Sequence, residues 1–169
     1  MTLPLEKATK INMNRLLSNP SDGHITQIMT WFANEAQLKI WSGPNFRYPF
    51  YFTSFKSDLN LTSLNSFSLL SSQNDLLAFG QYYFRAGKCH LGRLVVNPAF
   101  RGQAIVAELI NGLSIAGKKE LQVNACSLFV YNHNTNAIKA YEKLGFQVET
   151  YVEDIPLENC VYMVKRDLN

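Results

Sequence analysis

The feature that most constrains the fold is a strand–loop–helix–strand run in the second half of the chain. Apolar residues dominate 89–96, Asn97-Pro98 ends that stretch, and apolar positions recur at helical spacing from about Arg101 before a second apolar run at 125–131. A strand, a helix and a strand in this order normally form a right-handed crossover, which makes the two strands parallel. Ligands bind where such strands separate at their carboxyl ends, so the sequence predicts a site near Arg101.

Shorter strand signals surround this unit. Apolar runs at 66–72 and 76–84 precede it with tight turns between them, which predicts a meander of three antiparallel strands. A helix is expected in NTNAIKAYEKLGF, and two closing strands in QVETYV and CVYMVKRDL enclose a loop at 153–159. The resulting order, β-β-β-α-β-α-β-β, predicts an α/β (α+β) fold with a mixed, mostly antiparallel central sheet, a central parallel pair and flanking helices.

Cap residues mark the expected ends of the helices. The crossover helix is expected to end at Gly117, and the next helix to run from an N-cap at Asn134 to a terminating glycine at Gly145. Upstream, helical spacing at 25–32 and 34–41 predicts two short helices. The segment WSGPNFRYPF that follows contains glycine and two prolines and is expected to be a loop.

The overall composition describes one globular domain. The chain has 169 residues, of which 47% are hydrophobic, enough for a single domain over 1–169 with a core at 21–169 and a leader or first edge strand at 1–20. The net charge is only +3 and no basic run stands out, which disfavours a nucleic-acid-binding domain. The three cysteines lack the spacing of a metal site, so no metal is expected. No apolar run reaches ~18 residues and no secretory signal begins the chain, so we expect a cytoplasmic protein without a membrane partner.

The start of the crossover helix carries an Arg-Gly pair. Backbone N–H groups at a helix start have no partners and attract anions, and Gly102 lets a phosphate approach the main chain. The glycine patterns of the common ATP- and dinucleotide-binding loops are absent. Taken alone, the stretch favours an ordinary turn and helix cap over an anion site.

Two segments taken together point to a family. HLGRLVVNPAFRGQAIVAELI and NTNAIKAYEKLGF resemble the two signature segments of the GNAT-type N-acetyltransferases: a strand ending in Val-x-Pro with an Arg/Gln-x-x-Gly-x-Gly/Ala loop, and an Asn-x-x-Ala-x-x-x-Tyr-x-x-x-Gly-Phe helix. The second pattern is complete, at Asn134, Ala137, Tyr141, Gly145 and Phe146. The resemblance covers roughly 21–165, and WSGP…YPF is similar to the region of the first two helices in one bacterial subgroup of small acetyltransferases. It implies an acetyl-CoA-dependent N-acetyltransferase whose parallel strand pair is splayed at the cofactor site.

The resemblance also implies a role for each matching position. The strand residues Leu94, Val95 and Val96 would pair with the pantetheine amides of acetyl-CoA, and one of their N–H groups would stabilise the oxyanion. Asn134 would bond the pantetheine arm, with Ala137 also among the cofactor-binding positions. Tyr141 would bind the cofactor and, as a general acid, protonate the leaving thiolate, although a tyrosine on a helix stripe is by itself a typical core aromatic. The pyrophosphate would be held by the backbone amides of Arg101, Gly102, Gln103, Ala104, Ile105 and Val106.

Two positions of this loop depart from the family pattern. The family usually has glycine at the position of Ala104 and glycine or alanine at that of Val106. The valine side chain is large enough to crowd the pyrophosphate, so we expect weaker cofactor binding or a shifted loop. Val106 is also the feature that favours the alternative function, a non-catalytic acyl-CoA-binding sensor or regulatory module on the same fold.

An amine acceptor arrives as an ammonium ion and must lose a proton before it attacks, so a base is needed. His90 is the leading candidate, because simple alternation puts His90, Gly92, Leu94 and Val96 on one face of the strand. His133, just after a strand end, comes next. A lone histidine is, however, more often structural.

The acceptor pocket is implied by the resemblance rather than by any motif. Acidic groups suit a cationic amine and aromatic rings can cover its methylenes, but loop acids are usually solvated and aromatics usually fill cores. An arginine in the same loop would recruit a carboxylate equally well. Two loops would supply the pocket, with Trp41, Phe46, Arg47 and Tyr48 in the first and Glu153, Asp154 and Glu158 in the second.

The expected acceptor is a primary amine on a small molecule or peptide, which attacks directly in a ternary complex. An amino acid, a polyamine, an aminoglycoside and a protein N-terminus all fit this description. The acyl chain and the formation of a homodimer also stay open.

Overall fold

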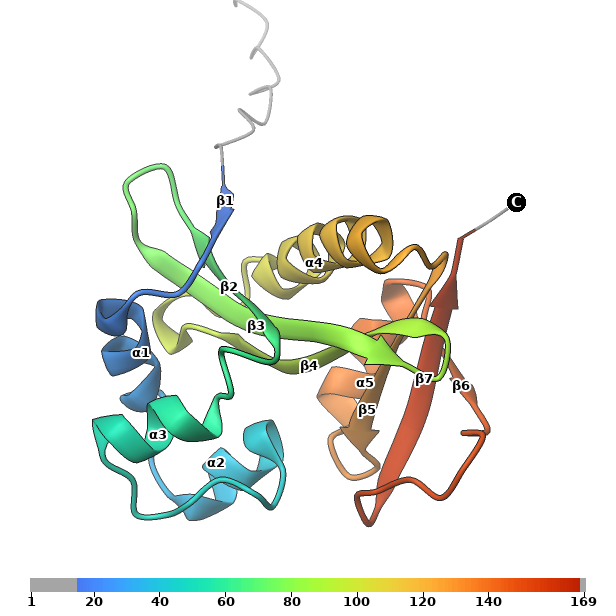
Figure 1. Cartoon of the computed structure of the whole chain (residues 1–169), viewed down its shortest axis with the longest axis horizontal. Coiled ribbons are helices and arrows are strands. Elements are labelled where there is room, and N and C mark those ends of the chain that lie inside the picture. Colours follow the sequence, from blue (N-terminus) through green and yellow to red (C-terminus); the bar gives the residue numbers. More distant parts are fainter. Residues whose placement is uncertain (1–14, 168–169) are drawn as a thin grey trace, which may run out of the picture.

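Residues 15–167 are described by a computed structural model, and within them the chain forms one seven-stranded sheet with helices on both faces (Figure 1). The strand order is β1-β2-β3-β4-β5-β7-β6, and only β4 and β5 in this sheet are parallel neighbours. The strands are β1 (Leu16–Ser18), β2 (Asn65–Leu70), β3 (Leu76–Arg85), β4 (Lys88–Val96), β5 (Ala125–Tyr131), β6 (Gln147–Glu149) and β7 (Cys160–Arg166). The helices are α1 (Asp22–Met29), α2 (Glu35–Ser42), α3 (Phe52–Asp58), α4 (Ile105–Leu121) and α5 (Thr135–Lys143), with a 3-10 turn at Pro98–Phe100.

The order of elements from β2 onward is the predicted one, and the parallel pair lies at the predicted crossover. The leader contributes the edge strand β1, while residues 1–14 lie outside the described part of the chain. Helix α3 was not expected. It begins just after the proline-containing segment WSGPNFRYPF, which was predicted to be a loop. Its start is fixed by the Tyr51 backbone N–H, which donates to the Ser54 hydroxyl at 3.0 Å, and its inner side buries Phe55.

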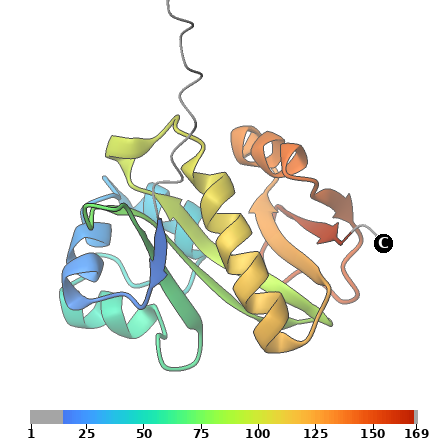
Figure 2. The ribbon, with the colours of Figure 1, turned by 90° about the horizontal axis from the view of Figure 1, so that it is seen from above.

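The two faces of the sheet carry different cores. On one face α4 crosses the sheet diagonally (Figure 2), and Leu109 and Leu113 of this helix pack with Leu91 of β4 and Leu128 of β5. On the other face α1, α2 and α3 cover β2 and β3 through an aromatic-rich cluster around Phe79. Helices α1–α3 lie beneath the first half of the sheet in Figure 1, so this face of β5 is not covered by them. None of the helices within residues 15–167 combines the length and apolarity needed to cross a membrane.

The prediction that Gly117 ends the crossover helix was wrong. Helix α4 continues to Leu121 and ends at Gln122, whose left-handed φ of 56° terminates it. Gly117 is instead buried within the helix, where a Cβ would lie 2.4 Å from Cys89 Sγ on β4 and 3.0 Å from the Tyr82 ring on β3. The glycine is required for close packing of helix on sheet. At the next helix the expectation was correct, since Gly145 follows the end of α5 with a φ of 96°.

A β-bulge in β4 changes which side chains share a face. Gln81 of β3 pairs with Gly92 but Phe79 pairs with Val95, so two residues of β4, Arg93 and Leu94, lie opposite one residue of β3. Arg93 has a left-handed φ of 49°, as bulge residues often do. The extra residue reverses the alternation beyond it.

The expected grouping of His90, Gly92, Leu94 and Val96 on one face was therefore wrong. Leu94 and Val96 pack against the α4 core cluster together with Leu91, which is the face opposite to that of His90. Strand pairing between β4 and β5 is confined to Cys89–Cys126, His90–Ser127 and Leu91–Leu128. Beyond Leu91 the two strands separate, as Figure 2 shows.

Candidate active site

A cavity of about 800 Å³ occupies the region where β4 and β5 separate. Its walls come from α2, from β3, β4 and β5, from α5 and the residue before it, and from the loop between β6 and β7, which together surround the space between α2 and β5 in Figure 1. The cavity brings together seven of the residues singled out in the sequence, namely Trp41, His90, Leu94, Val95, Arg101, Asn134 and Tyr141.

The loop before α4 has the geometry of an anion site. Gly102 has a φ of 80° and Ala104 a φ of 57°, and no side chain caps the helix that begins after them. Left-handed residues in such a loop turn successive N–H groups outward, and an uncapped helix start adds its own N–H groups and dipole. Alanine in this conformation costs about 1–2 kcal/mol, so the loop holds a strained backbone where a phosphate would bind. The residues present therefore fit the phosphates of coenzyme A.

The side chains of this loop leave its backbone accessible. Residues 101–104, including Gln103, are exposed, whereas Ile105 is buried in the core. Val106 is partly buried and packs against the α4 core cluster.

The edge of β4 that faces β5 offers backbone groups to an extended ligand. From Gly92 to Val96 this edge has no pairing with β5 in the described residues, so its N–H and C=O groups on that side lack a strand partner. Across the gap, Asn134 precedes α5 but its side chain makes no capping bond. Asn134 lines the cavity, whereas Ala137, one turn further along, packs against the core. The arrangement suits a pantetheine arm lying along β4 in the position of a missing strand.

Tyr141 projects from α5 into the wall of the cavity. Its ring contacts that of Phe146 with centroids 6.1 Å apart, and the residue lines the cavity. Burial raises the pKa of Tyr141 to about 12, because the phenolate would lose hydration. The phenol therefore carries its proton at neutral pH.

His90 is held in place by its neighbours. Its Nδ1 lies 2.8 Å from Ser127 Oγ on β5, and its ring packs between those of Tyr83 and Phe129 at centroid distances of 5.2 and 4.7 Å. Only 2% of the residue is exposed. Burial, with a further contribution from Arg85, lowers the pKa of His90 to about 3, so the imidazole is neutral at physiological pH. His133 is exposed, packs on Tyr131 and does not line the cavity.

The residues expected to form the acceptor pocket are dispersed. Trp41 lines the cavity, but Phe46 is buried in the aromatic cluster behind it, at 5.5 Å from the Trp41 ring. Arg47 donates to both carboxylate oxygens of Asp58, at 2.8 Å from Nη2 to Oδ1, and this pairing lowers the pKa of Asp58. Tyr48 is 43% exposed and does not line the cavity.

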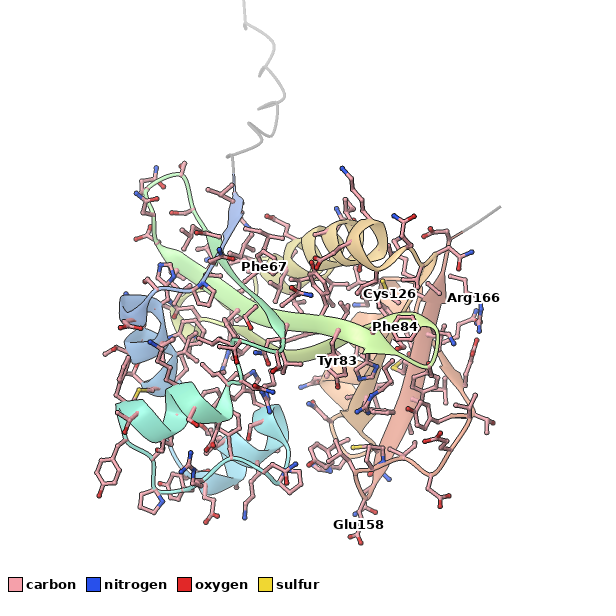
Figure 3. The ribbon with its side chains drawn as sticks, in the orientation of Figure 1. Phe67, Tyr83, Phe84, Cys126, Glu158 and Arg166 are labelled. Carbon is pink, nitrogen blue, oxygen red and sulfur yellow. The ribbon has the colours of Figure 1, made fainter. Side chains whose placement is uncertain are left out.

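The acidic residues of the β6–β7 loop also lie away from the cavity. Glu153, Asp154 and Glu158 are exposed, and Figure 3 shows Glu158 at the outer end of the loop, directed away from the body of the molecule. Pro156 and Leu157 are the residues of this loop that line the cavity.

Several cavity residues were missed in the sequence. Gln81, Tyr83 and Arg85 follow one another at every second position of β3, and Arg93 lies across from them on β4 (Tyr83 is labelled in Figure 3). Polar side chains at a period of two in an otherwise apolar strand were the available signal. Arg93 could not be recognised from such a period, because the bulge in β4 determines which face of the sheet its side chain lies on. Within residues 15–167 no group of three or more His, Cys, Asp or Glu side chains is arranged to hold a metal ion.

Comparisons with known proteins give consistent results. Residues 26–146 match the model of the acetyltransferase (GNAT) family, which is well over half of the chain. Among solved structures, a spermidine N-acetyltransferase from Vibrio cholerae in complex with CoA and spermine is 17% identical, with a TM-score of 0.69 over 92% of this chain and 96% of that one. The PaiA N-acetyltransferase from Thermoplasma acidophilum, in complex with coenzyme A, is 18% identical, with a TM-score of 0.64 over 92% and 100% of the two chains.

Proposed function

Because this chain belongs to the GNAT family of acetyl-CoA-dependent N-acetyltransferases, we propose that it acetylates a primary amine by direct attack in a ternary complex, with Tyr141 as general acid. The family resemblance read from the sequence is thereby confirmed, as are the mixed α/β fold and acetyl-CoA as the cofactor. The observation that carries the proposal is one cavity that joins Arg101, the first residue of the loop before α4, with the open edge of β4 and the Tyr141 side chain.

Binding is assigned to the backbone more than to side chains. The N–H groups from Gly102 to Val106 would hold the phosphates, and the β4 edge would hold the pantetheine amides. Bound acetyl-CoA supplies an activated thioester. An N–H of β4 near Leu94 would donate to the thioester oxygen and stabilise the charge that develops there during attack.

The chemical step needs two proton movements. As the amine nitrogen bonds to the acetyl carbon, the carbon–sulfur bond breaks and Tyr141 donates its proton to the leaving sulfur. A phenol of pKa about 12 is a weak acid towards a free thiolate, but the burial that raises the pKa of Tyr141 would also raise the proton affinity of the sulfur departing beside it. The phenolate then regains a proton from solvent.

His90 takes part as a neutral group in this proposal. If Nδ1 carries the ring proton and donates to Ser127, the lone pair of Nε2 is free to accept an N–H of the attacking amine. A pKa of about 3 prevents the ring from storing the proton, so the proton would pass through His90 or a water to solvent. The amine must therefore enter in its uncharged form.

The identity of the acceptor does not follow from the structural neighbours. At 17% identity the Vibrio cholerae enzyme bound to spermine shares its fold with this chain. The feature that favoured a non-catalytic sensor, Val106, packs against the core beside the phosphate-binding loop. An activity assay with a panel of amines identifies the acceptor and distinguishes a transferase from a non-catalytic sensor.

Purified protein is incubated with acetyl-CoA and a broad amine panel, and released CoA thiol is measured. We expect Tyr141→Phe to lower kcat about 100-fold or more, with the Kd for CoA unchanged, because general acid catalysis typically contributes that much. Tyr51→Phe, at a tyrosine that is 76% exposed, serves as the matched control. Binding of CoA without thiol release for any amine would instead identify an acyl-CoA sensor.

A further inference from the structure

The charged residues that line the cavity are all arginines. Arg85 and Arg93 lie on the β3–β4 wall, Arg101 lies at the loop before α4, and no aspartate or glutamate of the described chain lines the cavity. Arg101 is beside the loop assigned to the phosphates. Arg85 and Arg93 are on the side of His90, where the acceptor amine would approach.

Arg93 is held rigidly at the bulge of β4. Its Nη1 donates to Gln81 Oε1 at 3.1 Å and to the Leu59 carbonyl at 3.3 Å. The Gln81 side chain is itself buried and fixed, since its Nε2 donates to the Leu59 carbonyl at 2.7 Å and to Ser66 Oγ at 2.8 Å. The guanidinium also lies 4.8 Å from the centre of the Phe46 ring. A strained left-handed residue supported from several sides is typical of a functional position.

Neither arginine has a carboxylate partner in residues 15–167. Arg85 lies over the rings of Tyr83 and Phe129, at 5.3 and 5.1 Å, and forms no ion pair with a described residue. Asp58 is the carboxylate whose charge acts on Arg93, and it is already hydrogen-bonded to Arg47. The wall also includes Trp41, whose buried indole N–H has no acceptor in the described chain. This side of the cavity thus presents the guanidinium groups of two arginines that form no salt bridge within residues 15–167.

We propose that the acceptor is an amine that carries a carboxylate, and that Arg93, assisted by Arg85, binds this carboxylate and selects for it. The inference rests on the proposed function and adds the chemical class of its acceptor. The planar guanidinium matches a carboxylate in two parallel hydrogen bonds, and burial strengthens the charge pairing. A polycation would meet two positive charges that form no salt bridge with a described carboxylate, which is unfavourable. Gln81 acts as a positioning residue for Arg93.

The test uses matched pairs of acceptors with the full-length protein. Each of a set of α-, β- and ω-amino acids and dipeptides is compared with its own carboxamide, so that the amine is kept and only the carboxylate is removed. Aminoalkyl phosphates and spermidine complete the panel. We expect at least one carboxylate to exceed its amide about 10- to 100-fold in kcat/KM, the range given by a charge-assisted hydrogen bond.

Arg93→Gln should remove this preference by raising KM for the carboxylate, with little change in KM for acetyl-CoA. Arg166→Gln is the control, since it deletes an exposed arginine that is paired with Glu149 and does not line the cavity. If Arg93→Gln fails to fold, the comparison of each carboxylate acceptor with its carboxamide in the wild-type protein still tests whether the site prefers a carboxylate. Equal rates for acid and amide throughout, or a preference for spermidine or for a phosphate, would overturn the inference and leave the transferase function intact.

A second readout does not depend on turnover. The CoA-saturated protein is titrated calorimetrically with the N-acetylated amino acids and with their amides, which are the products of the two reactions. If the N-acetylated acids bind, their amides do not, and Arg93→Gln abolishes the binding, the carboxylate-bearing acceptor class is supported. This result would stand even if no amine were acetylated, and only the transferase proposal would then fail. Equal binding of acids and amides contradicts the inference.

Discussion

At the scale of single residues, the cavity keeps its two titratable candidates uncharged. Burial disfavours the imidazolium of His90 and the phenolate of Tyr141, so it moves the two pKa values in opposite directions, to about 3 and about 12. The sequence motif identified Tyr141 and its element, and alternation along the strand placed His90 in the sheet. Neither signal contained the burial of the two side chains, which determines which form each residue adopts.

Burial of neutral His90 makes stability depend on pH. The folded-state pKa lies below the ordinary value of 6.5, so the stabilisation is fully present above 6.5 and is lost as the pH falls towards 3. The groups packed around the ring are Arg85, Tyr83, Phe129 and Ser127, and the positive charge of Arg85 acts in the same direction. Between pH 7 and pH 5 we expect the free energy of unfolding to fall by about 2 kcal/mol through this residue.

Urea unfolding of the wild type and of His90→Gln at both pH values measures this contribution. The variant should lose about 2 kcal/mol less than the wild type over the interval, although it starts from a lower stability. Parallel decreases in the two proteins would show that His90 is not the group that titrates.

At the scale of elements, regular patterns were predictable and their local interruptions were not. The order of strands and helices from β2 onward followed from apolar periodicity and turn residues, because those signals come from many positions at once. Helix α3 was missed because its seven residues are too short for a clear period and follow Pro49. The bulge at Arg93 was missed because arginine carries no sign of a left-handed backbone. The position of Arg93 in the cavity wall depends on that bulge, so this residue was missed as well.

The packing of α4 on the sheet gives a prediction at this scale. Gly117→Ala places a methyl group against Cys89 Sγ and the Tyr82 ring, both in the rigid core, so we expect a net loss of about 1–2 kcal/mol even though alanine favours a helix by up to about 1 kcal/mol. Gly112→Ala on the same helix is the matched control. Its Cβ would meet only the end of the Leu17 side chain, at 2.9 Å, which can move aside.

Thermal and urea denaturation of the two variants provide the measurement. Gly112→Ala should be neutral or stabilising, and adding Cys89→Ala to Gly117→Ala should recover part of the loss, because it removes the contacted sulfur. A Gly117→Ala protein as stable as the wild type would contradict the close packing described for this residue.

At the scale of the whole molecule, the sheet consists of two parts with few direct links. Strands β1 to β4 with helices α1–α3 form one part, and β5, β7 and β6 with α5 form the other. Three residue pairs between β4 and β5, together with the packing of α4, join them. A ligand lying along β4 would contact Asn134 and Tyr141 on the second part as well as the loop before α4.

Coenzyme A should therefore stabilise the entire fold. At a concentration 100 times its Kd, a ligand that binds only the native state adds about 2.7 kcal/mol, which for a chain of this size raises Tm by about 5–11 °C. Differential scanning fluorimetry with CoA, and with pantetheine as a control that lacks the phosphates, measures the effect. Pantetheine should give a much smaller rise. Equal shifts would mean that the loop before α4 does not bind the phosphates.

The separation of β4 from β5 has a practical consequence for handling the protein. Without a ligand, the interior of the sheet contains strand edges whose hydrogen-bonding groups are available to a neighbouring molecule, and such edges template aggregation. Concentrated ligand-free preparations should consequently lose material on storage faster than preparations that contain CoA. The separation of β4 from β5 that allows CoA to bind thus also makes the ligand-free enzyme more prone to aggregation.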